Sequence, residues 1–175
     1  PEPRTPVEDR APDFKFTYVD LGTFTIDPTK KYRRSELADE LVNNISSPNQ
    51  RYLLEWENGR FRFSDRGKII KKGQMIAPND GKAANNGVFI LNNWGNYRHL
   101  SGTFIAFNAM GEKILSHYVR ANLFNNGLSP DGRYAVFQTC NNHDNSDSGK
   151  LFIFDLTTST LNQKTIPTHG WADSY

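Results

Sequence analysis

Internal repetition constrains this chain more than any other feature of its sequence. The repeated segments are NGVFILNN (86–93) with SGTFIAFNAMGEKILSHY (101–118), and RYAVFQTC (133–140) with SGKLFIFDLTTSTLNQKT (148–165). In each copy an apolar strand leads through a polar loop to a second strand that opens with Ser-Gly, and a more polar third strand follows. Gly102 and Gly149 mark the two copies and stand 47 residues apart. A weaker copy fits residues 52–72, where Gly59 lies 43 residues before Gly102.

The turn before each apolar strand extends the repeat. We read this turn as Pro78-Asn79-Asp80-Gly81 in one copy and as Ser129-Pro130-Asp131-Gly132 in the other. Asp80 and Asp131 are then 51 residues apart. A unit of 43 to 51 residues with four short strands has the size of one blade of a β-propeller.

The strand pattern from residue 50 onward supports this interpretation. Short apolar or alternating segments are separated by Gly, Asn, Asp and Pro, as in an all-β unit. The expected strands are Tyr52–Trp56, Gly59–Phe63, Lys68–Lys71, Gly87–Leu91, Thr103–Phe107, Lys113–Val119, Tyr134–Thr139, Leu151–Phe154 and Leu161–Ile166. The segment 88–91 is apolar on both faces, which indicates a strand covered by a neighbouring blade on each side.

The last copy also carries a family resemblance. The segment LSPDGRYAV (128–136), followed by GKLFIFDL (149–156), resembles the WD40-like "PD40" propeller repeat. That repeat occurs in TolB-type periplasmic proteins, in the propeller domains of prolyl-oligopeptidase-type peptidases and in lactonase-like proteins. The resemblance is most specific over residues 120–166 and weaker over 76–119. It implies the fold and brings no catalytic residues with it.

The first 49 residues differ from the rest. Residues 1–13 carry four prolines and are expected to form a flexible arm. Residues 14–49 begin with alternating, strand-like segments and predict a short α/β extension. Its helix would begin at the N-cap Ser35, present Leu37, Leu41 and Ile45 as one stripe, and end before Pro48. Residues 50–175 form the propeller-like blades.

Composition excludes several classes of protein. Among 175 residues, 21 Lys and Arg face 19 Asp and Glu, and a net charge of +2 gives no argument for a nucleic-acid partner. The only cysteine, Cys140, allows neither a disulfide framework nor a thiolate metal cluster. No apolar run approaches 18 residues, so no membrane span is expected. These features are compatible with a periplasmic, secreted or cytoplasmic location.

The number of blades creates a physical problem. Two and a half blades do not close a ring, and an open array leaves strand edges and apolar faces uncovered. The sequence begins at Pro1 and its last residues read like the start of another blade. We therefore expect an incomplete or split propeller: a fragment, or a chain that a protein partner or companion chain completes.

One loop has the composition of a binding site. Trp94, Tyr97, Arg98 and His99 lie between two strands of one repeat. Trp, Tyr and Arg dominate the binding hot spots of protein interfaces, so this loop is the expected contact with a protein or small ligand. The alternative is that its aromatic side chains pack between blades.

A second polar loop matches part of a calcium-binding pattern. Asp144, Ser146, Ser148 and Asp155 occupy positions 1, 3, 5 and 12 of an EF-hand-like loop, with Gly149 at position 6. Asp155 replaces the usual bidentate glutamate, and residues 150–154 read as a strand. Calcium is therefore the one cofactor considered, and an exposed hairpin loop is the alternative.

No catalytic constellation is visible. The four histidines show no metal-ligand spacing, no G-x-S-x-G motif occurs, and Cys140 has no readable partner. We therefore expect a non-catalytic binding or scaffold module, with no catalytic residues. The alternative is the propeller portion of a hydrolase or peptidase whose catalytic residues lie outside this chain. A third interpretation takes residues 14–49 as a separate partner-binding module.

Overall fold

The fold is built entirely of β-strands over the residues that the structure describes. This computed structural model describes residues 41–95, 100–140 and 146–165, all within one compact unit. The strands form three four-stranded sheets, which we call blade 1, blade 2 and blade 3. Blade 1 contains β1 (Asn43–Ser46), β2 (Tyr52–Glu57), β3 (Arg60–Asp65) and β4 (Lys68–Gln74). Blade 2 contains β5 (Ala77–Ala83), β6 (Phe89–Trp94), β7 (Gly102–Phe107) and β8 (Lys113–Val119). Blade 3 contains β9 (Leu123–Leu128), β10 (Tyr134–Thr139), β11 (Leu151–Asp155) and β12 (Thr160–Thr165).

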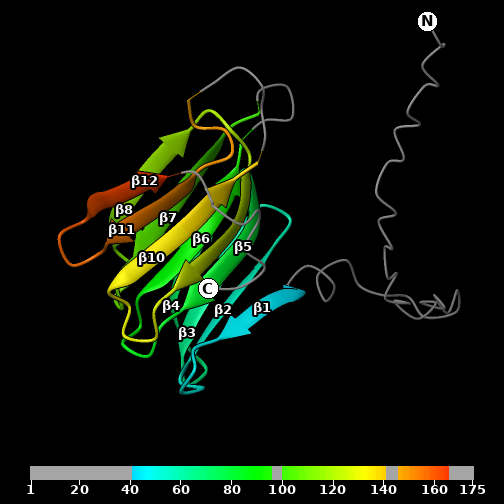
Figure 1. Cartoon of the computed structure of the whole chain (residues 1–175). Coiled ribbons are helices and arrows are strands. Elements are labelled where there is room, and N and C mark those ends of the chain that lie inside the picture. Colours follow the sequence, from blue (N-terminus) through cyan, green and yellow to red (C-terminus); the bar gives the residue numbers. More distant parts are fainter. Residues whose placement is uncertain (1–40, 96–99, 141–145, 166–175) are drawn as a thin grey trace, which may run out of the picture. The chain divides into compact units, whose positions relative to one another are not determined.

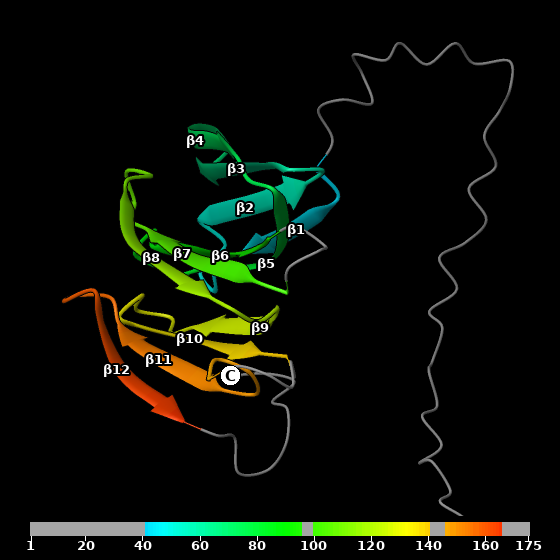
Figure 2. The same cartoon turned by 90° about the horizontal axis from the view of Figure 1, so that it is seen from above.

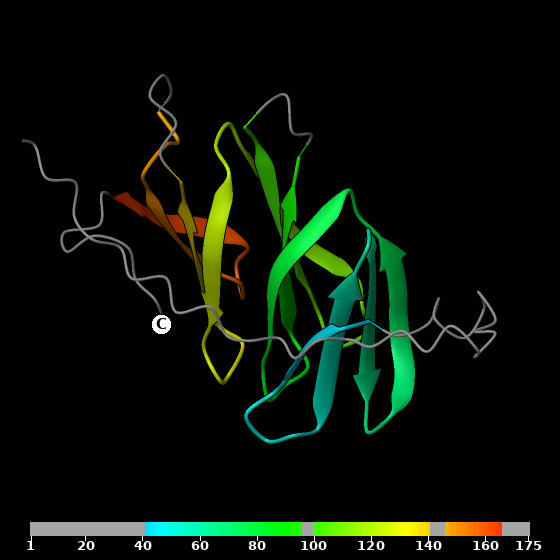
Figure 3. The same cartoon turned by 90° about the vertical axis from the view of Figure 1, so that its right-hand side faces the viewer.

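Each blade is an antiparallel meander whose strands pair in chain order (Figure 1). The blades follow one another in a row (Figure 3). The first strands β1, β5 and β9 lie on one side, and the last strands β4, β8 and β12 on the other (Figure 2). This arrangement confirms the expected all-β fold of propeller-type blades. The described residues include no helix that could cross a bilayer.

The repeat read from the sequence is confirmed at the third strand of each blade. Gly59 immediately precedes β3, Gly102 opens β7, and Gly149 lies two residues before β11. The expectation that β6 is covered on both faces is also confirmed. Phe89 and Leu91 belong to the core between blades 1 and 2, whereas Ile90 belongs to the core between blades 2 and 3.

Aromatic side chains fill both cores. Between blades 1 and 2, Phe89 stacks on Phe63 at 4.1 Å and on Phe107 at 4.6 Å between ring centroids. Between blades 2 and 3, Phe137 stacks on Phe104 at 4.8 Å and on Phe152 at 4.6 Å. The Phe63–Phe89 and Phe104–Phe137 pairs join neighbouring blades, whereas Phe89–Phe107 and Phe137–Phe152 each lie within one blade. Such ring pairs stabilise beyond the area they bury, so the two pairs between blades help to hold them face to face.

The predicted turn at Pro78–Gly81 is wrong, because these residues lie inside β5. A register shift between Pro78 and Asp80 marks a bulge in the pairing with β6. A bulge near the start of a strand tolerates proline, which has no amide hydrogen for the ladder. The alignment of Asp80 with Asp131 is therefore wrong as well.

The true equivalents of the 129–132 turn are the 47–50 and 84–87 turns. Each is closed by an amide-to-carbonyl bond, from Gln50 to Ser47 (2.8 Å), from Gly87 to Ala84 (3.1 Å) and from Gly132 to Ser129 (2.8 Å). In each, an Asn or Asp side chain accepts an amide two residues later, as Asn49, Asn86 and Asp131 do. The fourth turn position has φ of 61° at Gln50, 86° at Gly87 and 73° at Gly132. The sequence SPNQRY (47–52) thus folds like SPDGRY (129–134).

Hydrogen bonds join these three turns to one another. The Asn49 amide donates to Asn85 Oδ1 at 2.8 Å, and Asn49 Nδ2 donates to the Asn85 carbonyl at 3.2 Å. The Asn85 amide in turn donates to the Pro130 carbonyl at 2.9 Å. The turns therefore fix the spacing of neighbouring blades at this end of the molecule.

The predicted helix is wrong where the structure describes it. Residues 43–46 form β1, and Ile45 packs against the core between blades 1 and 2. Pro48 lies in the 47–50 turn and stops no helix. Blade 1 thus begins before residue 50, because pairing with β2 outweighs the weak helical stripe. Leu37, the arm at 1–13 and the extension up to residue 40 lie outside the described residues.

The first strands of blades 2 and 3 are joined by a polar contact. Asp80 Oδ2 accepts the Asn126 amide at 2.8 Å, and Asn126 Nδ2 donates to the Asp80 carbonyl at 3.1 Å. Asp80 Oδ1 also accepts from Lys82 Nζ at 2.8 Å. Asn126 is buried. One carboxylate thus satisfies a buried amide of the next blade.

Replacing Asp80 tests this contact. Asp80→Ala leaves the buried Asn126 amide without its acceptor, and we expect a loss of about 1–3 kcal/mol in the free energy of unfolding. Urea denaturation followed by tryptophan fluorescence measures it. Asp131→Ala, in an exposed turn with contacts inside that turn only, is the matched control and should destabilise less. Equal losses in the two variants would contradict the assigned role.

Candidate functional site

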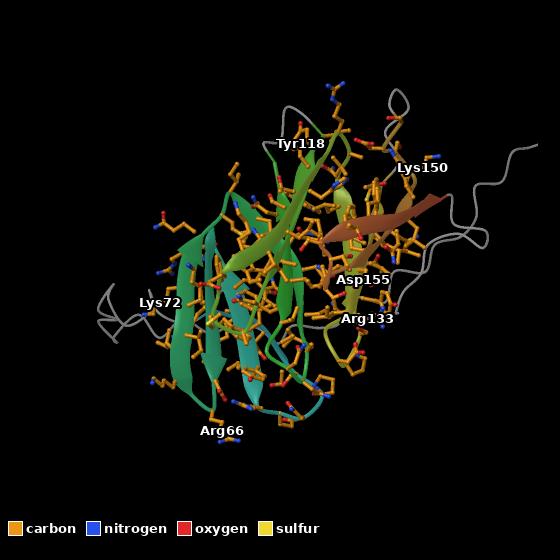
Figure 4. The ribbon with its side chains drawn as sticks, turned by 90° about the vertical axis from the view of Figure 1, so that its left-hand side faces the viewer. Arg66, Lys72, Tyr118, Arg133, Lys150 and Asp155 are labelled. Atoms are coloured by element: carbon orange, nitrogen blue, oxygen red, sulfur yellow. The ribbon has the colours of Figure 1, made fainter. Side chains whose placement is uncertain are left out.

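The candidate site lies where blades 2 and 3 meet, at the ends of their second strands. We call it the Trp94 rim and define it by its described residues: Trp94, Leu100, Tyr118, Arg120, Phe124 and Asp147. In Figure 4, Tyr118 and Lys150 lie at this end of the molecule, and Arg66 lies at the opposite end. The two loops predicted to carry function, at 92–99 and 141–149, fall on the β6–β7 and β10–β11 connections, which both leave the sheets here, except that residues 92–94 belong to β6.

Trp94 is the predicted binding residue that the structure describes, and it links two blades. It ends β6, and its indole Nε1–H donates to the Leu123 carbonyl in β9 at 2.7 Å. The ring packs against the core between blades 2 and 3 and remains partly exposed. Packing between blades, the alternative considered for this loop, is thus one role of Trp94. Tyr97, Arg98 and His99 lie outside the described residues.

Other apolar side chains at the rim were not singled out from the sequence. Leu100 is 45% exposed, Tyr118 61% and Phe124 42%. Tyr118 pairs in register with Thr103, next to the Trp94–Gly102 pair, and alternates with His117 and Val119, which face blade 3, so its side chain lies on the opposite face of blade 2 from Trp94. The indole of Trp94 donates to the Leu123 carbonyl at the start of β9, and Phe124 is the next residue of that strand. The sequence signal that could have found Tyr118 was an aromatic residue at a solvent-facing position of the alternating strand β8.

Asp147 organises the charged side of the rim. Its carboxylate accepts the Arg120 amide at 2.9 Å and Lys164 Nζ at 2.7 Å, and its carbonyl accepts the Thr139 hydroxyl. Partial burial acts to raise the pKa of Asp147, but the Arg120 amide and the Lys164 ammonium outweigh it, so the pKa lies below its usual value. The carboxylate therefore stays ionised and ties the 140–150 connection to blade 2.

The predicted calcium ligands have other partners where they are described. Asp155 Oδ1 accepts the amide and hydroxyl of Thr157, and Oδ2 accepts from Arg133 at 3.3 Å. Ser148 donates to the Cys140 carbonyl at 3.2 Å, and Ser146 is exposed. Asp144 lies outside the described residues. Within the described ranges, no three His, Cys, Asp or Glu side chains gather as metal ligands would.

Asp155 takes part in an Arg–Asp–Tyr arrangement that occurs once within blade 3 and once within blade 1. Arg133 pairs with Asp155 and lies 4.8 Å from the ring centroid of Tyr134. In blade 1, Arg51 donates to both oxygens of Asp65, at 2.9 and 2.7 Å, and lies 4.8 Å from the Tyr52 ring. Figure 4 shows Arg133 beside Asp155. This pattern spans two strands, so the local sequence motif did not reveal it.

Two further titratable side chains, Cys140 and His117, belong to the same two blades as the Trp94 rim. Burial raises the pKa of the free Cys140 thiol, which opposes formation of the reactive thiolate. His117 extends from β8 into the aromatic rings of blade 3, 5.4 Å from Phe152 and 5.2 Å from Phe154 between centroids. Burial lowers the pKa of His117, which nearby Asp147 raises and Lys164 lowers further.

The sequence was compared with known proteins. No known protein family and no curated protein matches it. Among solved structures, it is similar to the computationally designed protein Ika8 (11% identity, TM-score 0.52) and to hydrazine synthase of Kuenenia stuttgartiensis (16% identity, TM-score 0.50). Both matches cover 71% of this chain and 36% of the solved chain. Hsv2 of Kluyvelomyces marxianus gives 8% identity and a TM-score of 0.49, over 70% of this chain and 36% of that one.

The chain thus spans about a third of the length of the solved chains that it matches. At these sequence identities the similarity shows the fold alone, because one fold carries many functions.

The position of His117 predicts a pH dependence of stability. Because burial favours the neutral imidazole, the unfolded chain binds more protons than the folded chain between the lowered pKa and the ordinary value of 6.5. We expect the free energy of unfolding to fall as pH drops below 6.5. His117→Phe should flatten this part of the profile, measured by urea denaturation between pH 5 and 8. An unchanged slope in the variant would assign the effect to other groups.

Proposed function

We propose that this chain is a non-catalytic binding module of a β-propeller protein and that it contacts a protein or small ligand through the Trp94 rim. The supporting observation is the anchoring of Trp94. Its hydrogen bond to Leu123 and its packing against the core hold the indole in one position while part of it stays exposed. A rigid aromatic side chain loses little conformational entropy on binding, which is a property of hot spots.

The surroundings of Trp94 support the same proposal. Three exposed apolar side chains, Leu100, Tyr118 and Phe124, lie at strand ends or connections at the same end of blades 2 and 3 as the Arg120–Asp147 contact. Isolated exposed apolar residues are ordinary, but a group of them at one end of a blade array is typical of an interaction surface. In the sequence, Trp94 is followed by Tyr97 and Arg98, two further residue types that are enriched in hot spots, and by His99.

The relationship to PD40-type propeller repeats is part of this proposal. Its support is that the turn of SPDGRY (129–134) recurs in SPNQRY (47–52) with the same hydrogen bonds and the same Arg–Tyr–Asp contact. A local motif that keeps its contacts in two blades is a repeat in structure as well as in sequence. In a scaffold module built of such repeats, the partner of the Trp94 rim is a protein or a small ligand.

Peptide selection on the intact chain tests the rim. A phage-displayed random peptide library supplies the probes, and fluorescence anisotropy measures the affinity of the selected peptides. We expect Tyr97→Ala and Arg98→Ala each to weaken binding by about tenfold or more, as hot-spot truncations do. The unfolding midpoint of each variant is measured alongside, so that a loss of affinity is distinguished from a loss of folding.

Arg66→Ala is the matched control, because Arg66 lies in the β3–β4 turn at the opposite end (Figure 4). Its affinity for the selected peptides should equal that of the unaltered chain. Peptides that bind the Tyr97 and Arg98 variants normally but lose affinity for the Arg66 variant would place the binding surface elsewhere and refute the proposal.

A further inference from the structure

The two end faces of the blade array differ in chemistry. We call the face that a blade turns toward the next blade along the chain its forward face, and the opposite one its backward face. In blade 1, Tyr52, Leu54 and Trp56 lie on the forward face and pack against Phe89 and Leu91 of blade 2. Blade 2 presents little bulk there, because a Cβ at Gly81 would lie 2.9 Å from Leu54 and one at Gly87 would lie 2.9 Å from Tyr52.

Blade 3 repeats this forward face. The Tyr134 carbonyl accepts the Ser129 amide as the Tyr52 carbonyl accepts the Ser47 amide, so Tyr134 takes the place of Tyr52. Two residues later, Val136 takes the place of Leu54. Ile153 pairs in register with Val136 and alternates with Phe152 and Phe154, which face blade 2. The forward face of blade 3 is therefore apolar at the positions of Tyr52 and Leu54, whereas the buried Gln138 takes the place of Trp56.

This face is partly exposed at its apolar positions. Tyr134 is 39% exposed, and Val136 and Ile153 are partly exposed. A cavity of about 330 Å³ opens here between the Tyr134 and Val136 side chains and the 127–130 backbone. In blade 1 the equivalent Tyr52 and Leu54 are 5% and 0% exposed because blade 2 covers them. An apolar sheet face of this kind favours a partner sheet.

The backward face of blade 1 does not match it. Glu55 lies on this face, opposite the direction of Leu54 and Trp56, and Arg62 donates to both of its oxygens at 2.6 Å. Blades 2 and 3 carry Phe and Leu or Ala on their backward faces: Phe89 and Leu91, and Ala135 and Phe137. The Glu55 and Arg62 side chains are only 12% and 29% exposed, and an apolar face packed on this pair would bury the rest of their charged atoms without new hydrogen-bonding partners, which is unfavourable. Head-to-tail packing of a second copy is thus disfavoured.

We propose that the forward face of blade 3 docks a fourth four-stranded sheet that is not blade 1 of a second copy. The occupant is a sheet with apolar side chains where blade 2 has Phe89 and Leu91, and with small residues where blade 2 has Gly81 and Gly87. Continuity with the two existing blade interfaces carries this assignment. The surface is separate from the Trp94 rim, so neither proposal depends on the other.

Thiol labelling of an extended chain tests the proposal. The probe is the full chain with a second copy of residues 76–120, the blade 2 sheet, appended after Tyr175. The reporter is Val136→Cys in a Cys140→Ser background, with and without the appended sheet. We expect the appended sheet to slow labelling at position 136 by about tenfold or more, because a covered thiol reacts only when the interface opens. Tyr134→Cys is a second reporter on the same face.

Two controls make the result decisive. Leu53→Cys reports on the backward face of blade 1, and its labelling should not change. An appended sheet with serine in place of its copies of Phe89 and Leu91 should give no protection at position 136. Unchanged labelling at positions 134 and 136 in the extended chain would overturn the proposal. The proposal would also be overturned if, in the unextended chain, labelling at both position 136 and position 53 became slower as the protein concentration rose. That result would indicate head-to-tail association of two copies.

Discussion

Face-to-face burial of aromatic side chains between successive sheets is the interaction on which this structure depends. A single four-stranded sheet cannot bury both of its faces, so each blade is stable only against its neighbour. Blade 2 satisfies this condition on both sides, with Phe89 stacked toward blade 1 and Phe104 toward blade 3. The turns at 47–50, 84–87 and 129–132 then fix the spacing through hydrogen bonds that run from blade to blade.

The same need to bury the faces of each blade determines which side chains stay available for binding. At the interface between blades 2 and 3, the indole N–H of Trp94 donates to the Leu123 carbonyl, and the Asp147 carboxylate accepts the Arg120 amide. The rim above them keeps side chains that the cores do not use, and these include the exposed Tyr118 and Phe124. At the two ends of the array, the backward face of blade 1 carries charged residues and the forward face of blade 3 is mainly apolar, so the two end faces are chemically different.

The sequence alone predicted the strands whose side chains alternate or are uniformly apolar, such as β2, β6 and β8. It did not predict β1, β5 or β9, because these first strands carry Asn, Asp, Gly and Pro, for example in APNDGKA (77–83). Their polar residues serve contacts between blades, as Asp80 does for Asn126, and such contacts leave no periodic signal. The same cause led to the misplaced turn at Pro78 and to the helix assigned across Asn43–Ser46.

What the sequence by itself determined is the all-β class and the blade-sized repeat, because apolar periodicity and turn residues are local properties; the loop predicted to carry Trp94 begins only after it, since Trp94 ends β6. Only the tertiary structure decided that Ser47–Tyr52 is a copy of the Ser129 turn, that Asp155 partners Arg133, and that Trp94 anchors one blade to the next. These relations join residues that are far apart along the chain. They arise when the sheets stack, because stacking sets which polar groups become buried and therefore need partners.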